Sequence, residues 1–220
     1  MKQRQMAFKV QKSGDPKKRS LRAIGLGFRR GNGPWLFREV TLEIRPGEIV
    51  GLTGPSGRGK TTLGRLLSGY DHPSEGKVLL GNEVISHTDD AGYHPVQMVF
   101  QHPERAVNPR WRLRRIVSEG WQPDASFLHM LGIETDWLDR WPNELSGGEL
   151  QRICIARALG PETRFLIADE MTAMLDAITQ AQIWHNVLHI VRERQIGVLV
   201  ISHDVHLLHR LCDRMLNGLF

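Results

Sequence analysis

The chain has 220 residues, of which 40% are hydrophobic, and it carries a formal net charge of +5. This length supports one α/β domain with a core of its own. No apolar run approaches the ~20 residues that a membrane-spanning helix needs, which excludes a protein built from transmembrane helices. The cysteines, Cys154 and Cys212, form no CxxC pair, which favours a reducing compartment and excludes a disulfide or zinc framework.

The N-terminal segment, residues 1–20, is polar and aperiodic, and much of the positive charge lies in the first 22 residues. No apolar stretch follows this basic start, so we expect no secretory signal. A basic segment contacts nucleic acid or an anionic lipid surface, or it forms a solvated, flexible tail. We favour the tail, and we expect no nucleic-acid partner.

The next segment predicts a β-hairpin and then a strand, a loop and a helix. Residues 21–43 show short apolar alternations that are broken by the turn residues 29–34. Residues 49–53 form an apolar strand, a glycine-rich loop follows, and 61–70 carry leucines at helical spacing. Further strands are predicted at 77–80 and 96–100.

Residues 102–150 differ in composition and pattern from the rest of the chain. They hold four of the six tryptophans and show helical periodicity with no clear strand. We interpret them as a small helical insertion within a single domain that spans 21–220. The elements predicted after the insertion are a helix at 149–159, a strand at 165–168, a helix at 177–193 and a strand at 198–202. Alternating strands and helices indicate a largely parallel sheet that is covered on both faces.

The loop after the strand at 49–53 matches the phosphate-binding pattern G-x-x-x-x-G-K-[ST]. Its residues are Gly54, Pro55, Ser56, Gly57, Arg58, Gly59, Lys60, Thr61 and Thr62. Glycines let backbone N–H groups turn around a polyphosphate, and the helix that follows adds its dipole. Lys60 is expected to reach the β- and γ-phosphates, and the Thr61 hydroxyl group to ligate Mg²⁺.

Polar residues follow three of the predicted strands, at the edge where open α/β sheets bind ligands. Asp169 ends one strand and suits Mg²⁺, while Glu170 could orient the attacking water or be an acid stabilised at a helix start. We favour catalysis for Glu170. Gln101 and His203 follow two other strands, but a lone Gln or His is more often structural. His203, His206 and His209 are spaced too widely around a helix to predict a metal site.

A further motif, Leu145-Ser146-Gly147-Gly148-Glu149, lies between the phosphate loop and the carboxylates. Together these motifs resemble the nucleotide-binding subunits of ABC transporters over residues 21–215. The resemblance implies an α/β P-loop NTPase with a RecA-like parallel-sheet core, an N-terminal antiparallel β-subdomain and a small inserted α-helical subdomain. It implies ATP hydrolysis, with ATP and Mg²⁺ as cofactors.

The resemblance also assigns roles across a head-to-tail dimer, homomeric or with a sister ATPase. Ser146, Gly147 and Gly148 would form the signature loop that closes over the partner's ATP. Gln101 would contact Mg²⁺ and sense the membrane subunits, and His203 would contact the γ-phosphate. Leu175 and Asp176 would end the D-loop at the dimer seam. The aromatic that stacks on adenine would be Phe28, with Trp35 as second choice.

A finer resemblance concerns the strings at residues 99–103, 107–110 and 145–152, which are similar to the importers of dipeptides, oligopeptides and nickel. Within that branch, the sequence pattern as a whole most resembles the nickel or metal-chelate importers. This implies two transmembrane permeases and a solute-binding protein as partners, at the cytoplasmic face of the inner membrane. The alternatives are a soluble ABC ATPase on the ribosome or DNA, and a degenerate partner that only binds ATP.

The chain departs from this family at three places. The family usually continues after the catalytic Glu with Pro-Thr-Ser-Ala-Leu-Asp, whereas this chain reads Met-Thr-Ala-Met-Leu-Asp at 171–176. We expect the bulk of Met174 to alter the dimer seam. Glu149 stands where Gln is commoner, and the chain stops at Phe220, where relatives continue through another strand.

Overall fold

The computed structural model describes residues 19–85 and 92–216, so nearly all of the expected tail at 1–20 lies outside the described residues. The first sheet begins with strands β1 (Leu21–Arg29) and β2 (Trp35–Ile44), which pair antiparallel as the predicted hairpin. Strands β4 (Glu75–Leu80) and β5 (Glu83–Val84) extend it in the order β2-β1-β4-β5.

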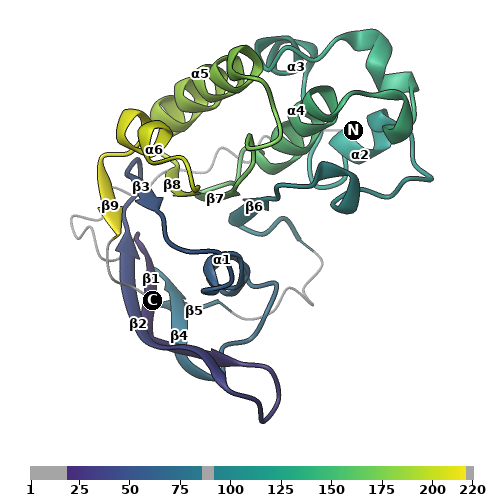
Figure 1. The fold of residues 1–220 in the computed structure, drawn as a ribbon. Coiled ribbons are helices and arrows are strands. Elements are labelled where there is room, and N and C mark those ends of the chain that lie inside the picture. Colours follow the sequence, from purple (N-terminus) through teal and green to yellow (C-terminus); the bar gives the residue numbers. More distant parts are fainter. Residues whose placement is uncertain (1–18, 86–91, 217–220) are drawn as a thin grey trace, which may run out of the picture.

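The second sheet is parallel, in the order β6-β7-β8-β3-β9 (Figure 1). Its strands are β3 (Ile49–Leu52), β6 (Val96–Val99), β7 (Phe165–Asp169), β8 (Gly197–Ile201) and β9 (Arg214–Leu216). Ile201 pairs with Asp169 on one side and with Leu52 on the other. The carboxyl ends of these three strands therefore lie at one level, and the segments that follow them leave from the same edge of the sheet.

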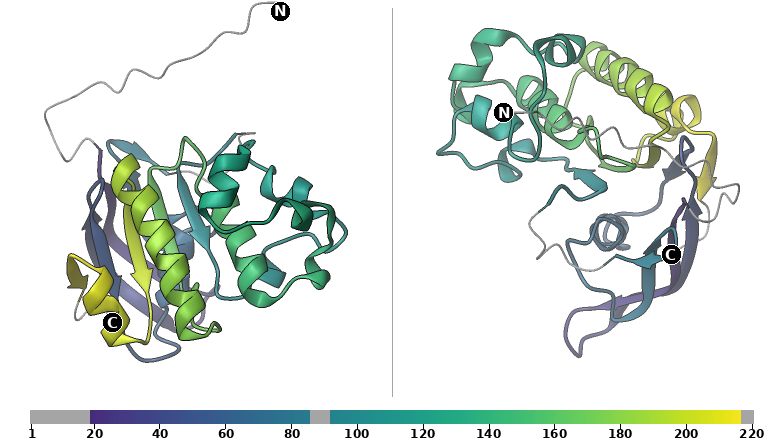
Figure 2. Two further views of the ribbon diagram at one scale, coloured as in Figure 1. Left: turned by 90° about the horizontal axis from the view of Figure 1, so that it is seen from above. Right: turned by 180° about the vertical axis from the view of Figure 1, so that it is seen from behind.

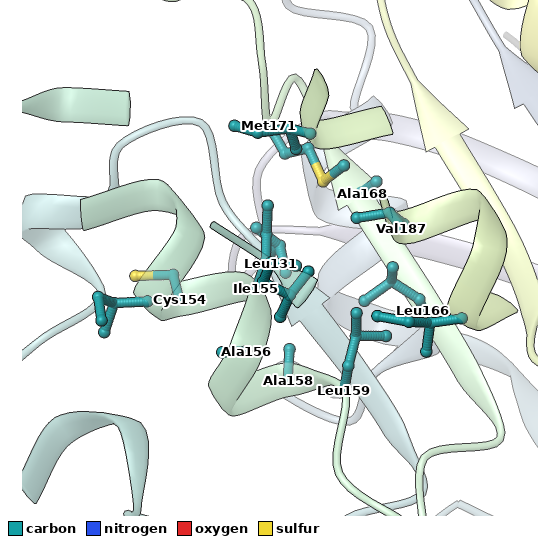
Figure 3. Close-up of a cluster of buried hydrophobic side chains, with 14 of the residues drawn as sticks. Leu131, Cys154, Ile155, Ala156, Ala158, Leu159, Leu166, Ala168, Met171 and Val187 are labelled. Atoms are coloured by element: carbon teal, nitrogen blue, oxygen red, sulfur yellow. The ribbon is translucent and has the colours of Figure 1, made fainter. Parts of the chain in front are cut away.

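Helices cover one face of the parallel sheet, and a helix with the antiparallel sheet covers the other. The helices are α1 (Lys60–Leu67), α2 (Leu113–Val117), α3 (Ala125–Met130), α4 (Gly147–Ala158), α5 (Ala177–Arg194) and α6 (Val205–Leu211). Phe165 and Ile167 of β7 pack in a core with α1, β1 and β2, whereas Leu166 and Ala168 face α4 and α5. Figure 3 shows the second core, where Leu166 lies beside Leu159 and Val187. The predicted parallel sheet with two covered faces is confirmed.

A helical unit extends from the β6 edge of the parallel sheet, beside α4 (Figure 2). It contains α2, α3 and the short 3₁₀ helices η2 (Pro103–Arg105), η3 (Thr135–Asp139) and η4 (Pro142–Glu144). The Trp121 ring packs edge-on against Phe127, with ring centroids 5.0 Å apart. The indole N–H of Trp121 donates to the carbonyl of Ala156 at 3.2 Å. Aromatic packing and this bond tie the unit to α4.

The prediction missed or shifted several elements. Helix α4 begins at Gly147, two positions before the predicted Glu149, because Ser146 caps it. Strand β5, helix α6 and strand β9 were not predicted, since each is too short to show a period of its own. Within residues 19–85 and 92–216, no helix has the length and apolarity to span a bilayer.

Candidate functional site

The phosphate loop connects β3 to α1 and relies on glycine backbone geometry. Gly57 and Gly59 have φ of 78° and 96°, the left-handed region in which a side chain is strained. A Cβ atom on Gly59 would also lie 2.8 Å from Cδ1 of Phe37, on strand β2. Glycine at this position therefore lets the loop turn into α1 while it packs against the β-hairpin.

Lys60 opens α1 and is buried, with only 7% of its surface exposed. Its Nζ atom donates to the carbonyl oxygens of Gly54 and Pro55, at 2.8 and 2.9 Å. A buried ammonium group needs partners that replace water, and here the loop's own backbone supplies them. The charge is thus held under the loop, where a polyphosphate would lie.

Asp169 ends β7 with 4% of its surface exposed. Burial raises the pKa of Asp169 above its ordinary value. A hydrogen bond from Thr61 and the charges of Lys60 and His203 oppose this effect without cancelling it. Its Oδ1 atom is buried and meets no hydrogen-bond partner in the described part of the chain. A carboxylate oxygen left open beside a hydroxyl group is a donor set that Mg²⁺ prefers, so the residues present fit this ion.

Glu170 follows Asp169 in a strained backbone conformation, with φ of 50°. Its N–H group donates to the carbonyl of Ile201 at 2.9 Å, which holds the turn against β8. The Nε2 atom of His203 lies 3.3 Å from Oε1 of Glu170, which makes an ion pair when the imidazole is protonated, but without hydrogen-bond alignment. The pKa of Glu170 is raised above its ordinary value, mainly by burial. The charge of His203 opposes this shift, and the charge of Asp169 adds to it.

A cavity of 610 Å³ brings most of the predicted site residues together. The predicted residues on its wall are Phe28, Trp35, Ser56, Gly57, Gly59, Lys60, Thr61, Thr62, Gln101, Glu170 and His203. They come from the antiparallel sheet, from the phosphate loop and α1, and from the segments that follow β6, β7 and β8, so the cavity joins segments that lie far apart in sequence. Gly54, Pro55 and Arg58 belong to the loop but do not line this cavity.

Both aromatic candidates for adenine stacking lie on this wall. The Phe28 ring stacks on Phe37, with centroids 6.4 Å apart and ring planes at 30°. The guanidinium groups of Arg29 and Arg38 lie 4.6 and 4.5 Å from the Trp35 ring centroid. Two cations already contact the Trp35 ring, which leaves less of its surface for adenine. Phe28 therefore stays the first candidate for stacking.

The hairpin tip also contributes residues that sequence reasoning did not select, namely Arg30, Gly33, Pro34 and Leu36. The signal that could have found them is the turn at residues 29–34, which separates Phe28 from Trp35. Arg30 adds a cationic side chain to a cavity that already holds Lys60. These two cationic side chains suit the cavity to an anionic ligand.

The signature-loop residues lie elsewhere. Ser146 is the N-cap of α4: its Oγ accepts from the N–H of Glu149 at 3.3 Å, and Glu149 Oε2 accepts from the N–H of Ser146 at 2.7 Å. This capping box gives Glu149 a structural role that suits an acid at a helix start. Ser146, Gly147 and Gly148 line a separate hollow of 970 Å³, together with Met174, Leu175 and Asp176.

Comparison with known families and proteins agrees with this geometry. A family model described as ABC transporter matches residues 37–173. The nickel import ATP-binding protein NikE of Rhodospirillum rubrum is 36% identical over 197 residues, covering 82% of this chain and 71% of that protein. NikE of Escherichia coli O157:H7 is also 36% identical, covering 82% of this chain and 74% of that protein.

A solved structure gives a matching fold. It is a dimeric, post-hydrolysis state of the ATP-binding cassette MJ0796 bound to ADP and Pi. It aligns with a TM-score of 0.74 at 25% identity, covering 89% of this chain and 92% of that chain. The phosphate loop, the two carboxylates and the capped helix α4 therefore lie on a shared cassette scaffold.

Proposed function

This chain belongs to the ABC transporter family, and from that premise we propose that it powers an importer of nickel or a nickel chelate. Its fold is that of a P-loop ABC ATPase, and its reaction is the hydrolysis of ATP. The proposed cargo rests on the 36% identity to proteins named for nickel import. Dipeptides and oligopeptides are the competing cargo, because the same sequence strings are similar to their importers.

One observation supports the proposed mechanism: the phosphate-loop residues and the signature-loop residues of this chain line two different hollows. Lys60, Glu170 and His203 face one cavity, whereas Ser146 and Gly148 face another hollow. A phosphate held by Lys60 therefore has no signature loop of its own chain beside it among the residues described. We infer that two ATPase subunits, either two copies or this chain and a sister, pair head to tail and share two sites.

Within each site we assign a role to each of the site residues predicted from the sequence. Gly54 to Thr62 hold the phosphates, and Phe28 stacks on adenine, with Trp35 as second choice. Thr61, Asp169 and Gln101 would hold Mg²⁺, which neutralises charge on the phosphates during transfer.

The other residues act on the water and the γ-phosphate. Glu170 orients the attacking water and accepts its proton, as a carboxylate beside the γ-phosphate can. His203 contacts the γ-phosphate from the end of β8. Ser146, Gly147 and Gly148 of the second subunit complete the site from the opposite side.

The remaining partners are proposed from the same family relationship. They are two transmembrane permeases and an extracytoplasmic solute-binding protein, with this chain bound at the cytoplasmic face of the membrane. The rival of a ribosome- or DNA-associated ATPase drew its support from the basic segment 1–20, which lies almost entirely outside the described residues. The rival of a non-hydrolysing partner is disfavoured because Asp169 and Glu170 both lie at the loop.

The test combines hydrolysis with transport. The purified chain is assayed for Mg²⁺-dependent phosphate release, and the transporter encoded with it is reconstituted in vesicles with labelled nickel, a labelled nickel chelate or a labelled dipeptide. We expect ATP-dependent uptake of nickel or its chelate. Uptake of the dipeptide alone would overturn the cargo, and hydrolysis without any copurifying permease or uptake would favour the soluble rival.

A further inference from the structure

A smaller cavity of 280 Å³ adjoins the 610 Å³ cavity described above, which we call the nucleotide cavity. Gln101 lines both cavities, and so connects the proposed Mg²⁺ site to the smaller one. The walls of the smaller cavity come from η2, from the start of α4 and from the loop after β7. Met171, Met174 and Leu175 make its apolar side.

Gln151 of α4 also lines this smaller cavity and is 1% exposed. Its Nε2 atom donates to the carbonyl oxygen of Phe100 at 3.1 Å. Phe100 directly precedes Gln101, so this bond fixes the backbone from which the Gln101 side chain starts. The side-chain amide cannot be flipped, because its oxygen would then face the Phe100 carbonyl, which is also an acceptor.

The Oε1 atom of Gln151 is left buried, with no hydrogen-bond partner in the described part of the chain. A buried acceptor without a donor is unfavourable, most of all in apolar surroundings. Two described side chains on the wall carry N–H groups, those of Gln101 and His102. In the neutral tautomer whose Nδ1–H faces Oε1 of Glu104, 3.2 Å away, Nε2 of His102 carries no proton, which leaves the Gln101 amide as the available donor.

We propose that Gln151 is a positioning residue for Gln101, acting through both ends of its amide. Nε2 holds the Phe100 backbone, and Oε1 accepts from the Gln101 amide when that side chain turns out of the nucleotide cavity. Gln151 lies one turn after Gly147 and Gly148, so it connects the Mg²⁺-contacting Gln101 to the helix that carries the signature loop. The inference rests on the role proposed above for Gln101.

The first test replaces Gln151 by Met, which is similar in size and cannot make either hydrogen bond. The matched control is Gln97→Met, because Gln97 lies on β6 and its Nε2 atom donates to a backbone carbonyl, that of His94, at 2.7 Å. We expect Gln151→Met to lower kcat roughly 10-fold and to change the KM for ATP less than about 2-fold. Gln97→Met should leave both within about 2-fold of wild type.

The second test is a double-mutant cycle with Gln101→Ala. If Gln151 acts through Gln101, adding Gln151→Met to Gln101→Ala lowers kcat by less than about 2-fold further. Two effects that multiply, or equal losses in Gln151→Met and Gln97→Met, would overturn the inference. Thermal unfolding is measured for each variant, and Gln151→Ala takes the place of a Gln151→Met protein that does not fold.

Failure of the inference is distinguishable from failure of the proposed function. The proposed function fails if the wild-type chain shows no Mg²⁺-dependent hydrolysis, and the role proposed for Gln101 fails if Gln101→Ala leaves turnover unchanged. The inference alone fails if wild type is active and Gln101→Ala is impaired, while the effect of Gln151→Met is independent of Gln101.

Discussion

Nε2 of His203 lies 3.3 Å from Oε1 of Glu170, although the two residues belong to segments that leave different strands. The register of the sheet explains this contact, because Asp169 at the end of β7 pairs with Ile201 at the end of β8. Glu170 then turns back with a positive φ, and its N–H group is held by the Ile201 carbonyl. Backbone pairing thus places a carboxylate and an imidazole together on the wall of the nucleotide cavity.

The first prediction tests Glu170 as the group that activates water. Glu170→Gln keeps the size of the side chain and removes the base, so turnover should fall roughly 10²–10⁴-fold. ATP binding should persist, because the phosphate loop is unchanged. Phosphate release and titration with a fluorescent ATP analogue measure the two quantities. Glu162→Gln, at an exposed acid before β7, is the control, and retained turnover in Glu170→Gln would remove Glu170 from its proposed role.

The second prediction concerns the shared site. Ser146→Arg should abolish hydrolysis but spare ATP binding by the same chain, because Ser146 does not line that chain's nucleotide cavity. Lys60→Ala should lose ATP binding but keep an intact signature loop. In a pair of one Ser146→Arg subunit and one Lys60→Ala subunit, the intact phosphate loop of the first meets the intact signature loop of the second. One of the two sites is therefore complete.

An equal mixture of these two inactive variants should therefore recover about a quarter of wild-type turnover, if pairs form at random. Recovery is measured as phosphate release after the variants are mixed in the presence of ATP. Each variant alone, at the same total concentration, is the control. A mixture that stays inactive would contradict pairing between two copies of this chain.

The phosphate loop and the main strands were predictable because their patterns are local. Apolar strand, glycine loop and leucine-spaced helix succeed one another within residues 49–70. Gln101 and His203 carried no such pattern: their positions after predicted strands placed them at the ligand-binding edge, and the family resemblance supplied their roles. The structure places both of them with Glu170 on one cavity wall, and their roles there remain proposals.

The features that were missed depend on contacts between distant segments. Strand β9 has three residues and exists through its pairing with β3. The hairpin tip lines the cavity because β2 packs on the phosphate loop at Gly59, a contact that no local spacing encodes. Gln151 had a signal that was overlooked: it lies three and seven positions before Cys154 and Ala158, on the buried stripe of α4.

The third prediction uses an ion pair that ties the turn before β3 to β9. Oε1 of Glu48 lies 2.6 Å from Nε of Arg214. Burial raises the pKa of Glu48, but hydrogen bonds from Arg214 and the Arg45 backbone, with both positive charges, bring it below its ordinary value. A depressed pKa in the folded state stabilises the fold above the ordinary pKa, and this stability is lost as the pH falls through the lowered value.

Glu48→Gln should therefore lower the free energy of unfolding by about 1 kcal/mol at neutral pH, a modest figure because Arg214 is partly exposed and screened. The difference from wild type should shrink as the pH falls through the lowered pKa of Glu48 and vanish below it, where the wild-type carboxylate is protonated as well. Urea unfolding at several pH values measures it. Glu193→Gln, at an exposed acid of α5, should show no such pH dependence, and a constant difference for Glu48→Gln would contradict the assignment.

The fourth prediction separates the two methionines of the loop after β7, which depart from the family pattern in different ways. Met171 stands where the family has proline and is 2% exposed, packed near Ala168 and Val187 (Figure 3). Met174 is 67% exposed and lines the hollow of the signature loop. The bulk of Met171 therefore fills the core, and the bulk of Met174 faces the proposed partner.

Met171→Ala should lower the free energy of unfolding by about 2–4 kcal/mol, because it leaves a cavity between β7 and α5. Met174→Ala should change it by less than ~0.5 kcal/mol. Met174→Arg should likewise spare stability but reduce turnover, because a charged side chain would enter the hollow that receives the partner's nucleotide. Thermal unfolding and phosphate release on the same preparations compare the three variants. A destabilised Met174→Ala, or a Met174→Arg with wild-type turnover, would show that this residue does not face the partner as proposed.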